Sequence, residues 1–118
     1  MQITHEFEVA RPVGQVWEMF QDVRSVAQCL PGATLTEDKG NNVYGGSIAV
    51  KLGPIAATFE GDATIAPDPA NRSALIEGRG VDKRGGSRGQ VKVNYGLTPS
   101  ESGGTKVVID ADMTLAGP

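Results

Sequence analysis

The sequence holds few of the residues with which proteins build catalytic or metal sites. Its 118 residues include a single histidine, His5, and a single cysteine, Cys29. One histidine leaves no spare base for a Ser-His-Asp triad and no histidine-based metal cluster, and one cysteine forms no internal disulfide. No activating base or cation stands near Cys29 in the sequence, which assigns it to packing. Asp110 and Asp112 fall on the wet face of a strand, and we expect no catalytic residue and no metal ligand.

Long apolar runs and concentrations of positive charge are also missing. No window approaches the ~18 uninterrupted apolar residues that a membrane span requires. The formal net charge is −3, and the eleven Lys and Arg residues form no stripe that would neutralise phosphates, so nucleic acid is not an expected partner. The first residues do not form an export signal. We therefore expect a cytoplasmic chain whose membrane contact, if any, is peripheral.

Glycine, by contrast, is abundant. It accounts for 16 of the 118 residues, against a usual share of about 7%, while aromatic residues make up only 5%. Glycines inside strands cost stability and usually mark bends or close approaches to the backbone. Two interpretations stay open from the residues alone: the glycines curve a sheet, or they curve it and also leave room for a ligand. The glycines concerned are Gly45, Gly46, Gly61, Gly78, Gly80, Gly89 and Gly96.

The apolar periodicity predicts one strand, two short helices and six further strands. Alternating apolar and polar residues from Ile3 to Val9 predict a strand with one buried face. An apolar stripe of helical spacing follows Pro12, and Asp22 is placed to cap a second short helix that residues 31–32 end. Beyond residue 33 the period is two, and turn clusters separate strands expected at 33–38, 42–52, 55–66, 72–82, 87–98 and 105–115.

These strands predict one curved antiparallel sheet in a single domain, residues 1–118. Short connections favour antiparallel neighbours, and the alternation gives the later strands one wet and one apolar face. Two short helices are too small to cover that apolar face. We therefore expect that a long C-terminal helix is missing from this chain, or that a partner chain supplies the cover.

The element order resembles the helix-grip fold of START-like and polyketide-cyclase-like domains, the SRPBCC superfamily. Within it, three segments resemble the CoxG family of carbon monoxide dehydrogenase subunits, and the similarity covers essentially the whole chain. The Gly104-Thr105 opening of the last strand also fits. The segments are Pro12-Val13-Gly14-Gln15-Val16-Trp17, Cys29-Leu30-Pro31-Gly32-Ala33 and Lys51-Leu52-Gly53-Pro54-Ile55-Ala56-Ala57-Thr58-Phe59-Glu60-Gly61.

The resemblance implies an α+β, helix-grip (START-like) fold and a non-catalytic accessory of a molybdenum-containing carbon monoxide dehydrogenase or related hydroxylase. The implied ligand is a lipophilic molecule, a quinone of the menaquinone or ubiquinone type, carried between the inner face of the cell membrane and the enzyme. Family members continue beyond this chain's last residues into a long helix, and some carry a further tail that is thought to reach the membrane. The physical requirement is an enclosed apolar cavity that replaces the hydrocarbon contacts of lipid.

The expected cavity residues lie on the apolar helix stripe and on inward strand faces. His5 and Tyr44 are candidate polar contacts, although His5 is otherwise an ordinary strand residue, and Trp17 either packs in the core or floors the cavity. Tyr95 adds a hydroxyl group to an otherwise apolar set of cavity candidates, which are Trp17, Phe20, Leu30, Ile48, Val50, Phe59, Tyr95, Ile109 and Met113.

Three further alternatives stay open. Lys83, Arg84 and Arg88 form a basic hairpin that is either a solvated loop or a contact for an anionic headgroup or an acidic partner. The chain could instead be an assembly or membrane-recruitment factor that transfers no ligand. It could also be a cyclase or hydrolase on the same fold, which would need several polar groups converging in the pocket.

Overall fold

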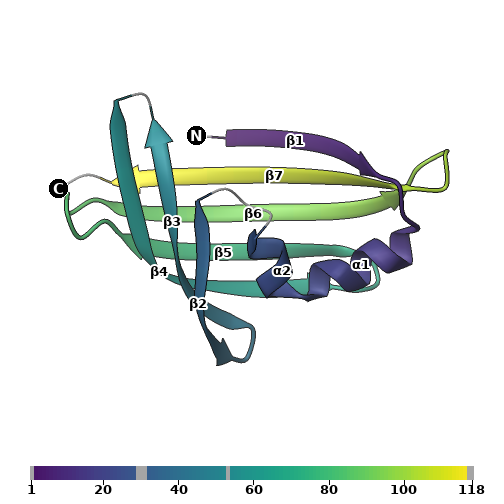
Figure 1. Ribbon diagram of the computed structural model, residues 1–118, viewed down its shortest axis with the longest axis horizontal. Helices are drawn as coiled ribbons and strands as arrows, with labels where there is room; N and C mark the ends of the chain where they lie inside the picture. The colour runs from purple at the N-terminus through teal and green to yellow at the C-terminus, as the bar shows by residue number, and fades with distance from the viewer. Residues whose placement is uncertain (1, 29–31, 53, 117–118) are drawn as a thin grey trace.

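The computed structural model describes residues 2–28, 32–52 and 54–116 of the chain. These residues form one antiparallel seven-stranded sheet and two short helices that follow the first strand, the order expected from the sequence (Figure 1). The expected bounds of the strands after the helices hold to within about two residues. The elements are β1 (Gln2–Val9), α1 (Val13–Gln21), α2 (Val23–Gln28), β2 (Ala33–Gly40), β3 (Val43–Leu52), β4 (Ile55–Asp68), β5 (Ser73–Val81), β6 (Arg88–Pro99) and β7 (Thr105–Ala116).

The two helices begin where the sequence predicts. Pro12 is the N-cap residue of α1, and its carbonyl oxygen accepts the first hydrogen bonds of that helix. Asp22 begins α2: its carboxylate accepts hydrogen bonds from the Ser25 hydroxyl at 2.8 Å and from the Ser25 N–H at 3.3 Å. The bond from the Ser25 hydroxyl is the main cause that lowers the pKa of the Asp22 carboxyl group. The predicted cap of the second helix is therefore confirmed.

The turn between β2 and β3 is tighter than its five-residue cluster of polar and glycine residues suggests. Asn41 and Asn42 alone connect the strands, with φ angles of 55° and 62°. Two central residues with positive φ are typical of a type I′ turn, and asparagine tolerates this conformation. The Gly40 N–H donates to the Asp38 carboxylate at 2.9 Å. As a result β2 extends two residues beyond its expected end at residue 38.

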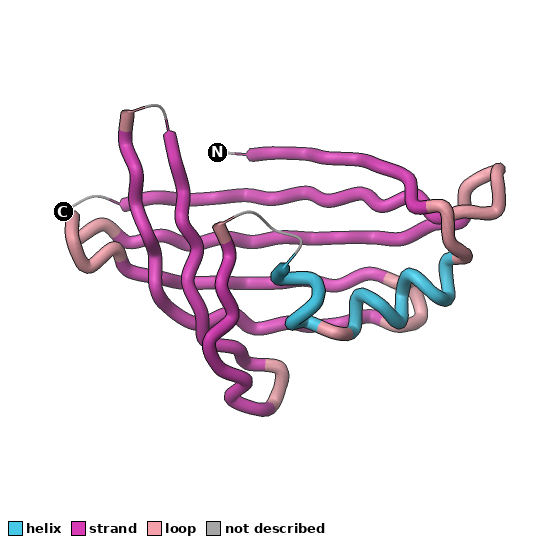
Figure 2. Tube along the Cα trace, viewed as in Figure 1, coloured by secondary structure: helices cyan, strands magenta, loops and turns pink. Residues whose placement is uncertain are grey.

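The sheet is strongly curved. Its strand order is β1-β7-β6-β5-β4-β3-β2, so the first and last strands pair, and β1 and β2 are its edges. Figure 1 shows β5, β6 and β7 running along the molecule, with β2 and β3 crossing them at a steep angle and β4 bending from one direction into the other. The helices lie along only one half of the molecule's length (Figure 2).

A row of four glycines crosses the sheet where it bends. Its members are direct partners on neighbouring strands: Gly46 in β3, Gly61 in β4, Gly80 in β5 and Gly89 in β6. A β-carbon at Gly61 would collide with the backbone carbonyl group of Arg79 on β5. Neighbouring backbones approach each other so closely here that glycine is required, which agrees with the curvature that the mid-strand glycines predict.

The hydrophobic core lies between α1 and the inner face of the sheet. Trp17 and Phe20 of α1 pack against it from the helix side. Thr105 at the start of β7 is fully buried, and its hydroxyl donates to the Arg11 carbonyl oxygen at 2.7 Å, which ties the β1–α1 connection to the sheet. The buried core residues are Val16, Ala74, Tyr95, Leu97 and Val107.

The expectation of a buried face on the first strand was wrong. All residues of β1 except Val9 are exposed, and Ile3 and Phe7 keep 54% and 37% of their surface accessible. The alternation itself is right, because Ile3, His5 and Phe7 pair with Ala111, Ile109 and Val107 on the inner face of β7. Burial fails because β1 is an edge strand with a neighbour on one side only.

Candidate functional site

The inner face of the sheet has a half that the helices cover and a half that they leave open. The covered half is the core, to which Ile65, Ile76 and Ile109 add partly buried side chains. Strand pairing continues the same face through further small and aliphatic residues outside that core. We call this set the open half: Ile48, Ala63, Gly78, Val91, Met113 and Leu115. Leu115 is 42% exposed, and the other five residues of the set are half-buried.

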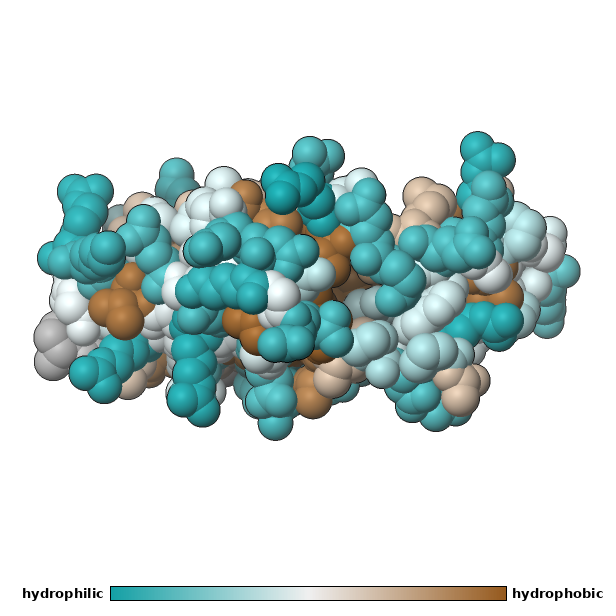
Figure 3. All heavy atoms as spheres, turned by 90° about the horizontal axis from the view of Figure 1, so that it is seen from below, coloured by the Kyte–Doolittle hydropathy of each residue, from teal (hydrophilic) through white to brown (hydrophobic). Residues whose placement is uncertain are grey.

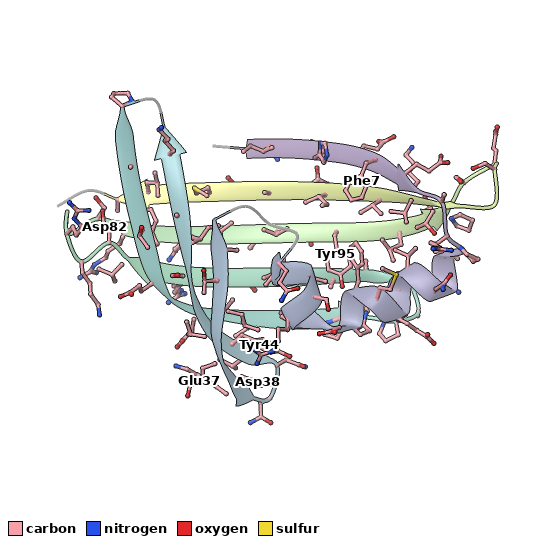
Figure 4. All side chains as sticks on the ribbon, viewed as in Figure 1. Phe7, Glu37, Asp38, Tyr44, Asp82 and Tyr95 are labelled. Carbon is pink, nitrogen blue, oxygen red and sulfur yellow. The ribbon has the colours of Figure 1, made fainter. Side chains whose placement is uncertain are left out.

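An aromatic cluster stands at the end of α1, on the covered half. The ring centroid of Tyr95 lies 5.1 Å from that of Phe20 and 6.5 Å from that of Trp17. Figure 4 shows Tyr95 between β6 and the helices. Burial raises the pKa of the Tyr95 phenol group, and a hydrogen bond with the Gln21 side chain opposes this effect. Three of the predicted cavity residues thus come together as one packed cluster with a single hydroxyl group.

Phe59 occupies the room that two glycines leave. The Phe59 side chain is 7% exposed. A β-carbon added at Gly80 would lie 3.1 Å from the Phe59 β-carbon, and a β-carbon added at Gly89 would lie 3.2 Å from the Phe59 ring. The side chain therefore reaches from β4 across β5 to β6. The space above these glycines is filled by Phe59 and is not free for a ligand. Between Tyr95 and Gly89, β6 spans about 20 Å at ~3.3 Å per residue, so an apolar strip of that order separates the two aromatic side chains.

The other predicted cavity residues lie on the inner face where the structure describes them. Ile48 and Met113 belong to the open half, and Ile109 packs against the core. Leu30 lies outside the described residues, and so does the side chain of Val50. The predicted set omitted Val91, which lies between Gly78 and Met113 on neighbouring strands. Its place in the period-two pattern of β6 was the signal that could have found it.

The polar side chains expected in the cavity do not converge. His5 is exposed on the edge strand β1, with its ring 5.5 Å from that of Phe7. Tyr95 lies two strands away on β6, and Tyr44 lies on β3 toward the β2–β3 turn (Figure 4). Within residues 2–28, 32–52 and 54–116, no group of three or more His, Cys, Asp or Glu residues could hold a metal ion. The inner face therefore offers apolar contact rather than an acid–base pair.

Two open depressions are lined by residues other than those of the open half, although Ala33, in the wall of the second, is the direct partner of Ile48. One, of about 220 Å³, is lined by polar and charged residues of β2, β3 and β4, among them Lys39 and Asp62, whose side chains form an ion pair at 2.8 Å. The other, of about 210 Å³, lies between α2 and β2 beside Ala27 and Leu35. Neither is built from the predicted cavity residues. In the part of the chain that the structure describes, no helix has the length and apolar character to cross a membrane.

Comparison with known proteins gives a family and a fold. The model of the CoxG family of carbon monoxide dehydrogenase subunits matches residues 6–118. No curated protein sequence matches the chain. A conserved protein from Geobacillus kaustophilus has a similar structure, with a TM-score of 0.79 and 16% identity over 99% of this chain and 76% of its own.

Two further solved structures are similar. The Zhui aromatase/cyclase from Streptomyces sp. R1128 has a TM-score of 0.66 and 19% identity over 100% of this chain and 70% of its own. A protein from Thermus thermophilus has a TM-score of 0.68 and 13% identity over 100% and 77%. At these identities the likeness concerns the fold alone. The expected helix-grip, START-like fold with its curved seven-stranded sheet is thereby confirmed.

Proposed function

The chain belongs to the CoxG family of carbon monoxide dehydrogenase subunits, and on that premise we propose that it binds a lipophilic small molecule on the open half of its inner sheet face. The observation that carries this proposal is the apolar strip between Tyr95 and Phe59. Strand pairing makes the strip continuous, and the helix-covered core does not include it. A contiguous apolar surface of this kind is typically buried by a ligand or partner.

The size of the strip suits a hydrocarbon tail. Burying one methylene group is worth about 0.8 kcal/mol, so a tail that buries about eight methylene groups against the strip gains roughly 6 kcal/mol. Association costs about 4–15 kcal/mol, so the gain from burying the tail exceeds this cost when the cost lies near the lower end of the range. An apolar tail with few polar atoms is therefore the ligand class that this surface favours.

We infer that the ligand is a quinone of the menaquinone or ubiquinone type. The Tyr95 hydroxyl group stands in the aromatic cluster beside the apolar strip, and quinone carbonyl groups accept hydrogen bonds from such donors. Membership of the family supports a role as an accessory that carries the quinone between the cell membrane and a molybdenum-containing carbon monoxide dehydrogenase.

We propose that this role is non-catalytic. A cyclase or hydrolase needs polar groups within hydrogen-bond reach of one reacting centre. His5, Tyr44 and Tyr95 instead lie on β1, β3 and β6, and His5 is exposed. The likeness to the Zhui aromatase/cyclase does not favour an enzyme, since at 19% identity it concerns the fold.

Trp17 provides the test, because it is the one tryptophan of the chain and lies in the cluster with Tyr95. A ubiquinone with a short isoprenoid tail, titrated into the purified chain, should quench the Trp17 fluorescence until the site is saturated. Val91→Asp puts a charge in the middle of the apolar strip and should weaken binding at least about tenfold, since an unpaired charge in an apolar contact costs more than about 1.4 kcal/mol.

Gln90→Asp is the matched control. It places the same carboxylate on the next residue of β6, on the exposed opposite face, and should bind the quinone as the native chain does. Circular dichroism verifies that both variants are folded. Quenching that does not saturate, or that both variants weaken equally, would refute the ligand site and leave the assembly or recruitment factor as the better account.

A further inference from the structure

The two edges of the sheet differ in what protects them. Backbone groups along a sheet edge have no neighbouring strand, and proteins usually blunt such an edge with bulges and charged residues. The edge strand β2 has both, because its register with β3 shifts between residues 35 and 37 and again between residues 38 and 40, where Glu37, Asp38 and Lys39 lie. Figure 3 views the molecule from the side of the β2–β3 turn and shows mostly hydrophilic side chains there. This edge is therefore poorly suited to pair with a further strand.

The other edge strand, β1, is regular and partly apolar. All of its 8 residues pair with β7 in one unbroken register, and residues 2–9 include no proline and no glycine. Figure 1 shows β1 as the outermost strand beside β7. Ile3 and Phe7, at 54% and 37%, are its exposed apolar side chains. A long, regular edge with exposed apolar side chains is a template for pairing with another chain.

Polar side chains on the outer face of β1 are engaged by β7 and by the loop before it. Thr4, Glu6 and Glu8 share that face, and each forms a hydrogen bond or an ion pair. Their partners, in the same order, are the Asp110 carboxylate at 2.9 Å, the Lys106 ammonium group at 3.0 Å and the Ser102 hydroxyl group at 2.9 Å. The two carboxylates of the strand are therefore held toward β7 and leave the free edge of β1 accessible.

A second copy of β1 is complementary to this edge. Two antiparallel copies related by a twofold axis keep their inner faces on the same side when the axis passes through a residue, since the side-chain period is two. With the axis at His5, Ile3 of each copy faces Phe7 of the other, and each Glu6 faces Thr4. With the axis at Glu6, the two Glu6 carboxylates would face each other, which is destabilising. With the axis at Thr4, Phe7 would face no residue of β1. The register centred on His5 therefore covers both apolar side chains and separates the carboxylates.

We propose that the chain forms a twofold-symmetric dimer through β1. The free N–H and C=O groups of the two strands form the ladder between the copies, and an Ile3–Phe7 pair covers each end of that ladder. Facing aliphatic and aromatic side chains stabilise such a pairing. The symmetric spacing of Ile3 and Phe7 about His5 favours a second copy over a strand of another protein. The inference goes beyond the proposed function, because pairing of the β1 strands requires no ligand on the open half.

The test is the mass of the purified chain in solution, measured by sedimentation equilibrium over a range of concentrations. The native chain should be a dimer that dissociates on dilution. Ile3→Lys removes both Ile3–Phe7 pairs of the dimer and should raise the dissociation constant at least about tenfold. Met19→Lys is the matched control, because Met19 lies on α1 and is 55% exposed, against 54% for Ile3. It should change the dissociation constant less than about twofold.

A mixture of two variants tests the register. Phe7→Glu alone should weaken the dimer as Ile3→Lys does. Mixed in equal amounts, the two variants should form a heterodimer that is tighter than either homodimer. In that heterodimer the new ammonium group faces the new carboxylate at one end, and Ile3 faces Phe7 at the other. Circular dichroism verifies that all variants are folded.

Three results would overturn the proposed dimer. They are a native chain that stays monomeric at every concentration, equal weakening by Ile3→Lys and Met19→Lys, and a mixture no tighter than the separate variants. A monomer that binds another protein through β1 overturns it as well. Dimerisation that Ile3→Lys weakens and the mixture restores supports it, whatever the result for the quinone.

Discussion

Replacement of Gly61 by alanine is expected to destabilise the fold strongly. The new β-carbon would collide with the Arg79 carbonyl group and lie 2.8 Å from the Gly80 α-carbon. Both neighbours are backbone atoms of a paired strand, so no side-chain rotation relieves the contact and β4 must move away from β5. Overpacking costs about 1–3 kcal/mol, and a backbone collision belongs at the upper end. At roughly 4 °C per kcal/mol for a chain of this size, the Tm should fall by about 12 °C.

Gly96→Ala is the control for this prediction. Gly96 also lies inside a strand, β6, but its β-carbon would meet no atom within 4 Å. Alanine there restricts the unfolded chain, so the Tm should stay the same or rise by about 2 °C. Thermal unfolding followed by far-ultraviolet circular dichroism measures both. If Gly61→Ala melts with the native chain, close packing at the glycine row is not what requires glycine and the account of the bend is wrong.

Two other perturbations test the covered half. Thr105→Val removes the donor to the Arg11 carbonyl oxygen and should lower the free energy of unfolding, measured in urea, by about 1–2 kcal/mol. Thr98→Val, on the exposed face of β6, is the control and should have little effect. Equal losses in the two variants would contradict the role of this hydrogen bond. Burial raises the pKa of the Tyr95 phenol group, so the folded chain holds the phenolic proton more tightly than the unfolded chain does. The resulting contribution to stability is present below pH about 10 and is lost as the pH rises through the pKa of Tyr95 in the folded chain. Tyr95→Phe should therefore lose less stability than the native chain between neutral pH and pH ~11, and identical losses would show that Tyr95 is not the group responsible.

The sequence predicted those features that depend on local pattern. Alternation located the strands, Asp22 marked the start of α2, and the abundance of glycine indicated curvature. These follow from backbone geometry and from hydrogen bonds between residues near each other in the chain. The face of each strand was also predictable, because the side-chain period is two.

Features that depend on pairing between distant strands were not predictable. Alternation puts Phe59 on the inner face, but only the register of β4, β5 and β6 brings it over Gly80 and Gly89. In the same way, alternation puts His5 on the inner face without showing that β1 is an edge strand and His5 exposed. A periodic pattern identifies a face, whereas burial depends on what covers that face.

Native mass spectrometry of the chain after incubation with a ubiquinone tests the central claim most directly. The account predicts one quinone bound per chain, retained by Gln90→Asp and lost by Val91→Asp, because the ligand lies along the apolar strip of the open half. A chain that retains no quinone, or a Val91→Asp variant that retains as much as the native chain, would contradict it.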